Sequence, residues 1–291
     1  MRAAGLRHNR ASPALPDSML PIICPVCRCV LDQHAKVWSC ANRHSFDVAR
    51  EGYVNLLLAQ QKNSPSPGDS AESLQARRAF LDAGHYAPLR EAIRSLAREL
   101  GARRMLDLGC GEGYYTSALA ESDHDIEGDT DVAGLDIAKP AIQLAARRYR
   151  GIRWLVGSGA ALPFADRSLD LVTNLFTQLH VSELRRVIDI GGHLVIVTPG
   201  PEHLWSLRAG LFDAVQAHEP EKFLSELGEG FALDRRLDIG SELDLDQQAL
   251  RNLLAMTPYV WKARPEKRAQ LEAASGLRTK AHFTALVVRR C

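Results

Sequence analysis

The chain has 291 residues, a net charge of +1 at pH 7 and a hydrophobic fraction of 46%. This length allows one large domain with a small appended one, and the balanced charge excludes bulk disorder and a surface dominated by polyanion binding. No apolar run approaches the ~20 residues of a transmembrane helix and no signal sequence is recognisable, so we expect a cytoplasmic protein with no membrane partner.

The N-terminal region contains a metal-ligand pattern. Residues 1–20 mix Arg, Pro, Ala and Ser without periodicity, which predicts a disordered extension. Residues 21–58 then form a small module with the spacing C-x2-C-x12-C-x3-H, whose members are Cys24, Cys27, Cys40 and His44. Cysteine and histidine at this spacing form tetrahedral zinc sites, and a closed set of four leaves no vacant position. We therefore predict a structural Zn²⁺.

Two features leave alternatives open within this module. Cys29 and His34 lie close enough in the sequence to replace one of the four ligands. A group of reduced thiols without metal is the other interpretation, since six cysteines in the whole chain are too few and too clustered for a disulfide scaffold.

Residues 59–100 read as a linker followed by helices. Gln60 to Ser70 is polar and rich in proline, which predicts a linker or loop. Residues 71–100 have helix-forming composition with a break at Gly84, so two helices are expected. Tyr86 at this break is either a packing residue or part of a segment that closes over a ligand.

A glycine-rich turn follows the first strand of the main sheet. The run from Met105 to Tyr115, M-L-D-L-G-C-G-E-G-Y-Y, predicts a strand that turns tightly into a helix. Glycines without Cβ atoms let a ligand approach the backbone, and free N–H groups at such a turn bind nucleotide-like cofactors. A dinucleotide fingerprint would need glycine where Tyr114 stands. Asp107 with the alternating glycines instead resembles the S-adenosylmethionine-binding turn of Rossmann-like methyltransferases.

Apolar strands and helical segments alternate after this turn, as in a doubly wound parallel sheet. Asp136 ends the second strand, where a carboxylate can accept hydrogen bonds from ribose hydroxyls or cap the following helix. Ser158 follows the third strand in a loop that resembles the methyltransferase loop beside adenine. Further strands are expected at the ranges 154–156, 168–174 and 193–198.

The C-terminal part is less regular. Phe231 to Leu245 and His282 to Arg289 alternate in polarity, which predicts an antiparallel edge of the same sheet. Between them, the aromatic residues of Met256 to Lys262 either stack a nucleobase or pack against the sheet. A basic cluster at the end of the second helix, Arg147 to Arg153, is either a solvated helix terminus or an RNA contact.

The order of several segments along the chain identifies a family. These are the four metal-ligand positions and the ranges 46–57, 67–70, 77–86, 109–115, 198–204 and 256–258. From Ile22 to Val288 the chain resembles the zinc-containing (RlmA-like) 23S ribosomal RNA (guanine-N1)-methyltransferases. The resemblance implies a class I methyltransferase fold over residues 101–291 and an N-terminal zinc module that helps to bind RNA.

The resemblance also implies a reaction and a set of site residues. The reaction is methyl transfer from S-adenosylmethionine to N1 of one guanine in a hairpin of the large-subunit RNA, by an enzyme that is a homodimer. The cofactor-binding residues that we predict are Tyr86, Asp107, Gly109, Gly111, Glu112, Gly113, Tyr114, Tyr115, Asp136, Ser158 and His203.

The target-base side of the site is less defined. After the fourth strand the family often has an aromatic residue followed by Ala-Pro, whereas this chain has Phe176-Thr177-Gln178. Asn174, at the end of the fourth strand, either contacts the guanine or caps the strand end, and the sequence identifies no residue that accepts the N1 proton. Two other functions compete: a methyltransferase that acts on a small molecule, and a catalytically inactive zinc-bearing RNA-binding protein. The zinc pattern argues against the first and the intact glycine turn against the second.

Overall fold

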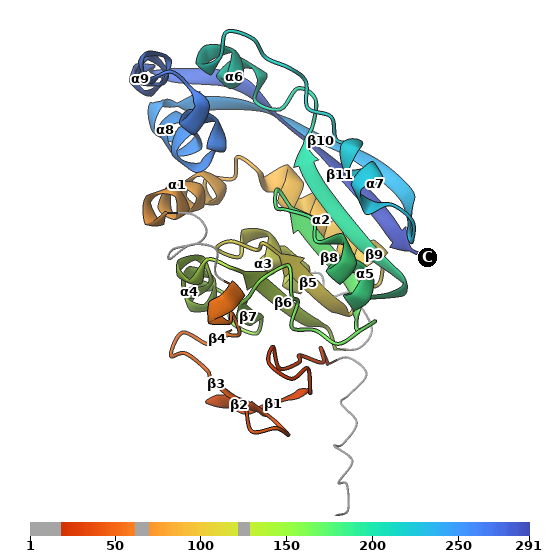
Figure 1. Cartoon of the computed structure of the whole chain (residues 1–291). Helices are drawn as coiled ribbons and strands as arrows, with labels where there is room; N and C mark the ends of the chain where they lie inside the picture. The colour runs from red at the N-terminus through yellow and green to blue at the C-terminus, as the bar shows by residue number, and fades with distance from the viewer. Residues whose placement is uncertain (1–18, 62–69, 122–128) are drawn as a thin grey trace, which may run out of the picture.

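An eight-stranded mixed sheet forms the centre of the molecule (Figure 1). The computed structural model describes residues 19–61, 70–121 and 129–291, and the strand order is β10-β11-β9-β8-β5-β6-β7-β4. The strands from β9 to β4 run parallel to one another. Their bounds are β4 Tyr53–Asn55, β5 Arg104–Leu108, β6 Asp131–Asp136, β7 Arg153–Val156, β8 Leu169–Leu175 and β9 Ile188–Pro199.

Helices cover both faces of the parallel strands, which is why these strands are short, nearly continuous apolar runs. Strand order reverses between β5 and β8, and the carboxyl ends of parallel strands at such a switch point are the usual place for a ligand. The helices are α1 Ala71–Asp82, α2 Ala87–Glu99, α3 Tyr114–Glu121, α4 Lys139–Arg148, α5 Val181–Val187, α6 Trp205–Leu211 and α7 Lys222–Leu227.

Two long antiparallel strands, β10 (Phe231–Asp246) and β11 (Gly276–Arg290), complete the sheet beside β9. This confirms the predicted edge, although both strands are longer than predicted. The segment between β10 and β11 holds α8 Gln247–Met256, η3 Pro258–Lys262 and α9 Pro265–Ala273.

The zinc module is built on a three-stranded antiparallel sheet of β1 (Leu31–Gln33), β2 (Val37–Cys40) and β3 (Ser45–Asp47). Its chain then continues into β4, which pairs with β7 of the main sheet. Apolar residues of the module, Trp38 among them, belong to one buried cluster. The same cluster contains Leu155 and Phe164 from the part of the chain that forms the main sheet. The module and the sheet therefore share one core.

Some predicted segments fall outside the described residues, including the extension up to residue 18 and most of the linker from Gln60 to Ser70. Leu20, which we assigned to the extension, is fully buried, and its N–H donates to Asp131 Oδ2 at 2.8 Å. The helices α1 and α2, assigned to a linker region, contribute Phe80 and Leu89 to the core of the main sheet. Among the described residues, no helix has both the length and the hydrophobicity needed to cross a membrane.

Candidate cofactor site and zinc cluster

The glycine turn between β5 and α3 lies directly beside the end of β6. The N–H groups of Gly109 and Cys110 donate to Leu135 O at 2.8 and 3.2 Å. Gly109, Gly111 and Gly113 all have left-handed backbone, with φ of 74°, 56° and 88°. Glycine is the residue that adopts these angles without steric cost. The turn is thus fixed by its own backbone and by β6.

The sequence predicted that these glycines leave room for a ligand to approach the backbone. Two of them are needed for another reason. A Cβ atom at Gly109 would lie 2.7 Å from Thr177 Cγ2, and one at Gly113 would lie 2.6 Å from the Trp154 ring. The space beside these two glycines is filled by the protein's own side chains, not left for a ligand. At Gly111 the nearest atom is farther away, at 3.7 Å, and belongs to the flexible Arg77 side chain.

Asp107 holds the turn from inside the protein. The side chain is only 2% exposed, and its carboxylate accepts hydrogen bonds from Thr116 Oγ1 at 2.6 Å and Thr173 Oγ1 at 2.8 Å. Burial raises the pKa of Asp107 to about 6, against the opposing effect of the two hydroxyl donors. Because these donors come from α3 and β8, the carboxylate ties both elements to β5. This geometry gives Asp107 a positioning role.

Asp136 at the end of β6 faces the glycine turn. Its Oδ2 accepts from the Gly111 N–H at 2.9 Å, and its Oδ1 accepts from the Ala138 N–H at 2.7 Å. The carboxylate therefore lies against the turn and fixes the backbone just before α4, but it is not the cap of this helix, whose N-cap is Ala138. Each carboxylate oxygen has a second lone pair, so the side chain can still accept hydrogen bonds from a ligand.

Ser158 lies at the same edge, after β7. Its neighbour Gly157 donates an N–H to Asp136 O at 3.0 Å, which places the loop next to the end of β6. The Ser158 hydroxyl accepts from the Ala160 N–H at 3.3 Å and is partly exposed. The strand ends thus bring the turn, Asp136 and Ser158 together, as the sequence predicted.

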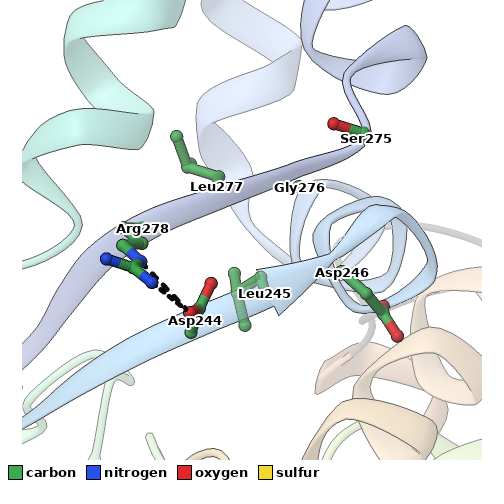
Figure 2. A pocket seen from close by; sticks show the side chains of 7 residues that line it. All are labelled: Asp244, Leu245, Asp246, Ser275, Gly276, Leu277 and Arg278. Carbon is green, nitrogen blue, oxygen red and sulfur yellow. Dashed lines mark hydrogen bonds and ion pairs between the residues drawn. The ribbon is translucent and has the colours of Figure 1, made fainter.

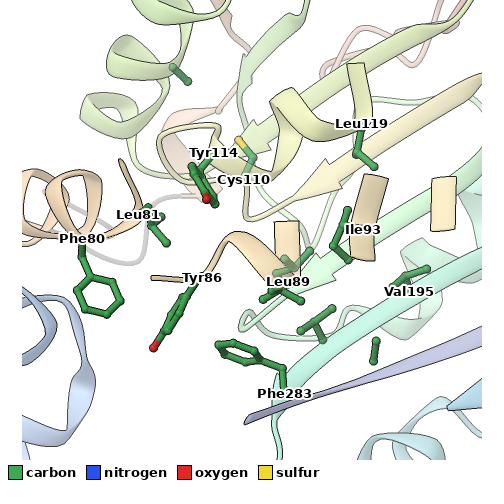
Figure 3. Close-up of a cluster of buried hydrophobic side chains, with 14 of the residues drawn as sticks. Phe80, Leu81, Tyr86, Leu89, Ile93, Cys110, Tyr114, Leu119, Val195 and Phe283 are labelled. Carbon is green, nitrogen blue, oxygen red and sulfur yellow. The ribbon is translucent and has the colours of Figure 1, made fainter. Parts of the chain in front are cut away.

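Tyr86 and His203 come from distant parts of the chain and meet on one aromatic cluster. Figure 3 shows two of its members, Tyr86 and Phe283. Their ring centroids lie 6.2 Å apart, and both rings pack on Phe283, at 4.8 and 4.7 Å. His203 Nδ1 accepts from the His282 N–H at 3.2 Å, and burial lowers the pKa of His203 to about 3. His203 is therefore neutral, with its proton on Nε2.

Of the remaining predicted residues of the turn, Glu112 and Tyr114 are buried and Tyr115 is half-buried. Tyr114 packs beneath the Arg90 guanidinium, 5.5 Å from its ring centroid, and burial raises the pKa of Glu112. The Tyr115 hydroxyl is buried without a hydrogen-bond partner in the described part of the chain. An unpaired buried hydroxyl is costly. A polar ligand beside the turn would satisfy it, so these residues fit a cofactor of the S-adenosylmethionine type.

On the target-base side, the contacts of Asn174 favour its capping interpretation. This residue is buried, and its Nδ2 donates to Gln178 O at 3.3 Å, so it supports the loop after β8. Phe176 and Phe283 were not among the predicted site residues. Phe283 lies within a predicted strand, but no local signal in the sequence places it against Tyr86 and His203.

The four predicted metal ligands form one cluster, with all their ligand atoms within 4.8 Å of one another. Cys24 Sγ and Cys40 Sγ lie 3.6 and 3.5 Å from His44 Nδ1, and Cys27 Sγ lies 3.6 Å from Cys40 Sγ. Zn–S bonds of about 2.3 Å in a tetrahedron place sulfur atoms about 3.8 Å apart. The donor set therefore fits a tetrahedral Zn²⁺. Cys29 and His34 are not members of this cluster.

Two tight turns present these ligands. The Arg28 N–H donates to Cys24 O and the Arg43 N–H donates to Cys40 O, both at 2.8 Å, and both arginines have positive φ. The backbone N–H of Cys29 lowers the pKa of Cys27 to about 6. A lowered thiol pKa favours the thiolate form that binds zinc.

Some aromatic residues of η3 are packed against the protein and others are exposed. The Tyr259 hydroxyl lies 3.1 Å from His218 Nε2, and the Arg208 guanidinium lies 5.8 Å from the Tyr259 ring centroid. Trp261 is 77% exposed. A surface hollow lies nearby in the fold, where β10 ends and β11 begins (Figure 2), but none of its lining residues was predicted for the site.

Comparison with known proteins identifies the two parts of the chain separately. A zinc-ribbon family model described as "RlmA, N-terminal" matches residues 22–65, and a model described as "Methyltransferase domain" matches residues 105–191. A "23S rRNA (guanine(748)-N(1))-methyltransferase" of Streptomyces fradiae is 34% identical over 85% of this chain and 88% of its own length.

Two further relatives match over similar lengths. A "Putative 23S rRNA (guanine-N(1)-)-methyltransferase" of Micromonospora griseorubida is 31% identical over 89% of this chain and 93% of its own length. A protein of Bacillus subtilis with the same description, YxjB, is 32% identical over 85% of this chain and 89% of its own length.

Proposed function

Because the chain belongs to the family of 23S rRNA (guanine-N1)-methyltransferases, we propose that it transfers a methyl group from S-adenosylmethionine to N1 of one guanine in a hairpin of this RNA. The observation that carries the proposal is the presence, in one chain, of a closed Cys3His cluster and a glycine turn with Asp136 at the strand ends. A small-molecule methyltransferase has no use for the zinc module, and an inactive RNA-binding protein has none for the turn.

The cofactor would be held at the carboxyl ends of β5, β6 and β7. When bound, S-adenosylmethionine supplies a methyl group that is bonded to a positively charged sulfur atom. A nucleophilic nitrogen can attack this methyl carbon, and the sulfur atom leaves. Asp136 would accept hydrogen bonds from ribose hydroxyls and Ser158 would contact the adenine amino group, and the position of both residues at the strand ends supports these roles. Asp107 keeps the turn in place through Thr116 and Thr173.

The aromatic cluster contributes by its low polarity. Tyr86 and His203 are both neutral at physiological pH, because burial raises the pKa of the phenol and lowers that of the imidazole. Their packing against Phe283 excludes water from this side of the site. N1 lies on the Watson–Crick edge of guanine, so the base must be unpaired and turned out of its stack before it can enter.

Labelled S-adenosylmethionine tests the proposal. The protein is incubated with this cofactor and with 23S rRNA from cells that lack its N1-methylguanines, and the label is mapped by mass spectrometry. N1 methylation blocks Watson–Crick pairing, so primer extension locates the modified guanine, which we expect at the position equivalent to 748 in the Streptomyces relative's name. Label in a small-molecule extract but not in RNA would contradict the proposal, as would cofactor binding without transfer.

We also propose that the enzyme is a cytoplasmic homodimer in which the zinc module contributes to RNA binding. Light scattering during size-exclusion chromatography should give about twice the 32.1 kDa mass of one chain. A mass of one chain across the working concentration range would contradict the dimer and leave the methylation proposal unaffected.

A further inference from the structure

Phe176, at the end of β8, has an unfavourable backbone conformation. Five described residues other than glycine have positive φ, and three of them are arginines in turns. The other two are Phe176, with φ of 58°, and Leu204, with φ of 50°. A bulky side chain in the left-handed region is rare because Cβ crowds the carbonyl oxygen. Such conformations persist where the surroundings impose them, and they cluster at functional sites.

Contacts on both sides impose this conformation on Phe176. Its N–H donates to Val197 O of β9 at 3.0 Å, which fixes the backbone before the bend. The next residue, Thr177, packs so tightly against Gly109 that a Cβ atom there would lie 2.7 Å from Thr177 Cγ2. Phe176 is therefore the neighbour in the chain of a residue, Thr177, that packs directly on the glycine turn.

Burial of the ring does not offset this strain. Leu204, which begins α6, is fully buried, so its side chain gains the full benefit of packing. The Phe176 side chain instead remains 47% exposed, although the buried Phe283 lies only 5.5 Å away between ring centroids. Phe283 is in turn the residue on which Tyr86 and His203 pack. Figure 3 shows Phe283 beside Tyr86. Phe176 thus presents a free aromatic surface at the outer end of the aromatic cluster.

We propose that Phe176 stacks on the target guanine once this base has left the RNA helix. The inference rests on the proposed function and names the residue that holds the acceptor base. Stacking engages the face of a base and leaves its Watson–Crick edge, and hence N1, free to face the glycine turn. The strain would then be maintained because it holds the ring exposed next to the cofactor site.

Substitution of the ring tests the contact. Phe176→Ala should lower kcat/KM for the RNA hairpin by about 5- to 150-fold, the range observed when a stacking aromatic residue is removed. Its affinity for S-adenosylmethionine, measured by calorimetry, should equal that of the wild type. Phe176→Tyr and Phe176→Trp should recover most of the activity. Wild-type kcat/KM in the alanine variant would overturn the proposal, as would a parallel loss of cofactor affinity.

Stability measurements separate this role from a structural one. Alanine normally gives a more stable protein than glycine, but at a left-handed position glycine relieves the strain. Phe176→Gly should therefore melt about 2–4 °C above Phe176→Ala and still be defective with RNA. Arg167→Gly and Arg167→Ala provide the matched control, since Arg167 is exposed with φ of 51° and should show the same order with full activity.

A readout without methyl transfer distinguishes this inference from the proposed function. A hairpin that carries the fluorescent base 2-aminopurine in place of the target guanine should be quenched by the wild type and not by Phe176→Ala. Equal quenching by both proteins would overturn the stacking contact. Quenching by the wild type without transfer to natural RNA would instead contradict the proposed function.

Discussion

The Asp136 carboxylate makes backbone contacts inside the protein and also faces the proposed ligand site. It accepts the Ala138 N–H just before α4 and the Gly111 N–H of the turn, and it remains partly exposed. We expect Asp136→Ala to weaken the binding of S-adenosylmethionine by at least severalfold, because the ribose hydroxyls lose an acceptor in a desolvated site. Isothermal titration calorimetry measures this change directly.

Two further variants separate the ligand contact from the loss of the backbone contacts. Asp136→Asn can still accept the Ala138 N–H through its carbonyl oxygen, so it should retain more stability than Asp136→Ala while the cofactor affinity remains low. Asp129→Ala removes an exposed carboxylate near the opposite end of β6 and should leave the affinity unchanged. Wild-type affinity in Asp136→Ala would remove this residue from the site.

Burial of His203 in the aromatic cluster makes the free energy of unfolding depend on pH. Its pKa in the unfolded chain is about 6.5. Burial first, and then the nearby His218, lower its pKa in the folded protein to about 3. Below pH 6.5 the unfolded chain binds a proton that the folded protein does not, so the free energy of unfolding falls by up to about 1.4 kcal/mol per pH unit. Above pH 6.5 this contribution is constant.

The substitution His203→Asn checks this contribution. The amide oxygen of asparagine can accept the His282 N–H that His203 Nδ1 now accepts, and asparagine does not titrate. Urea unfolding between pH 4 and 8 should show a shallower acid slope than in the wild type. The nearby half-buried His218 titrates in both proteins and does not contribute to the difference. Identical slopes would show that His203 is protonated in the folded state.

At the scale of residues, the geometry of the turn could be predicted because its signal is local, while the cofactor contacts of its residues stay predictions. The turn residues and Asp136 follow from a strand, a turn and a helix within one stretch of chain, and their contact across β5 and β6 follows from parallel pairing. Phe283 was missed because it reaches the site only through the pairing of β11 with β9. The left-handed backbone of Phe176 was also missed, because it arises from Thr177 packing against Gly109.

The zinc module gives a prediction at the scale of elements. We expect one zinc per chain in protein purified without chelators, and loss of the metal in Cys40→Ser and His44→Ala. Cys29→Ser is the matched control, since Cys29 lies two residues from a ligand but outside the cluster, where its Sγ accepts from Asn42 Nδ2 at 3.5 Å. Elemental analysis that finds no zinc in the wild type would refute the site.

Elements were predicted well where their apolar runs were continuous. The parallel strands β5 to β8 begin and end within one residue of the predicted positions, because both of their faces are buried. The strand β4 has only three residues, and its place beside β7 depends on a pairing that no local pattern reveals. The helices α8 and α9 were not predicted, and α9 has no buried residues to create a clear apolar face.

At the scale of the whole molecule, the zinc module is joined to the sheet rather than appended to it. The chain passes from the module into β4, Ile22 forms a bridge with Phe164, and Trp38 belongs to the same buried cluster as Leu155. Loss of the module would expose this cluster on the main sheet. A chain that begins at residue 59 should therefore be insoluble or unfolded, whereas two independent domains would tolerate the truncation.

The shared core further predicts that zinc removal destabilises the whole chain and that both parts unfold together. Trp38 reports on the module and Trp154 on β7, and both are buried, so variants that retain only one of them give separate fluorescence signals. Their thermal transitions should coincide and should shift together to lower temperature when a chelator is added, because the metal binds only the folded cluster. The remaining tryptophans, Trp205 and Trp261, are exposed and can be replaced by phenylalanine in both variants. If the Trp38 transition moved alone, the two parts would be energetically independent, and the shared cluster would contribute little to the stability of the sheet.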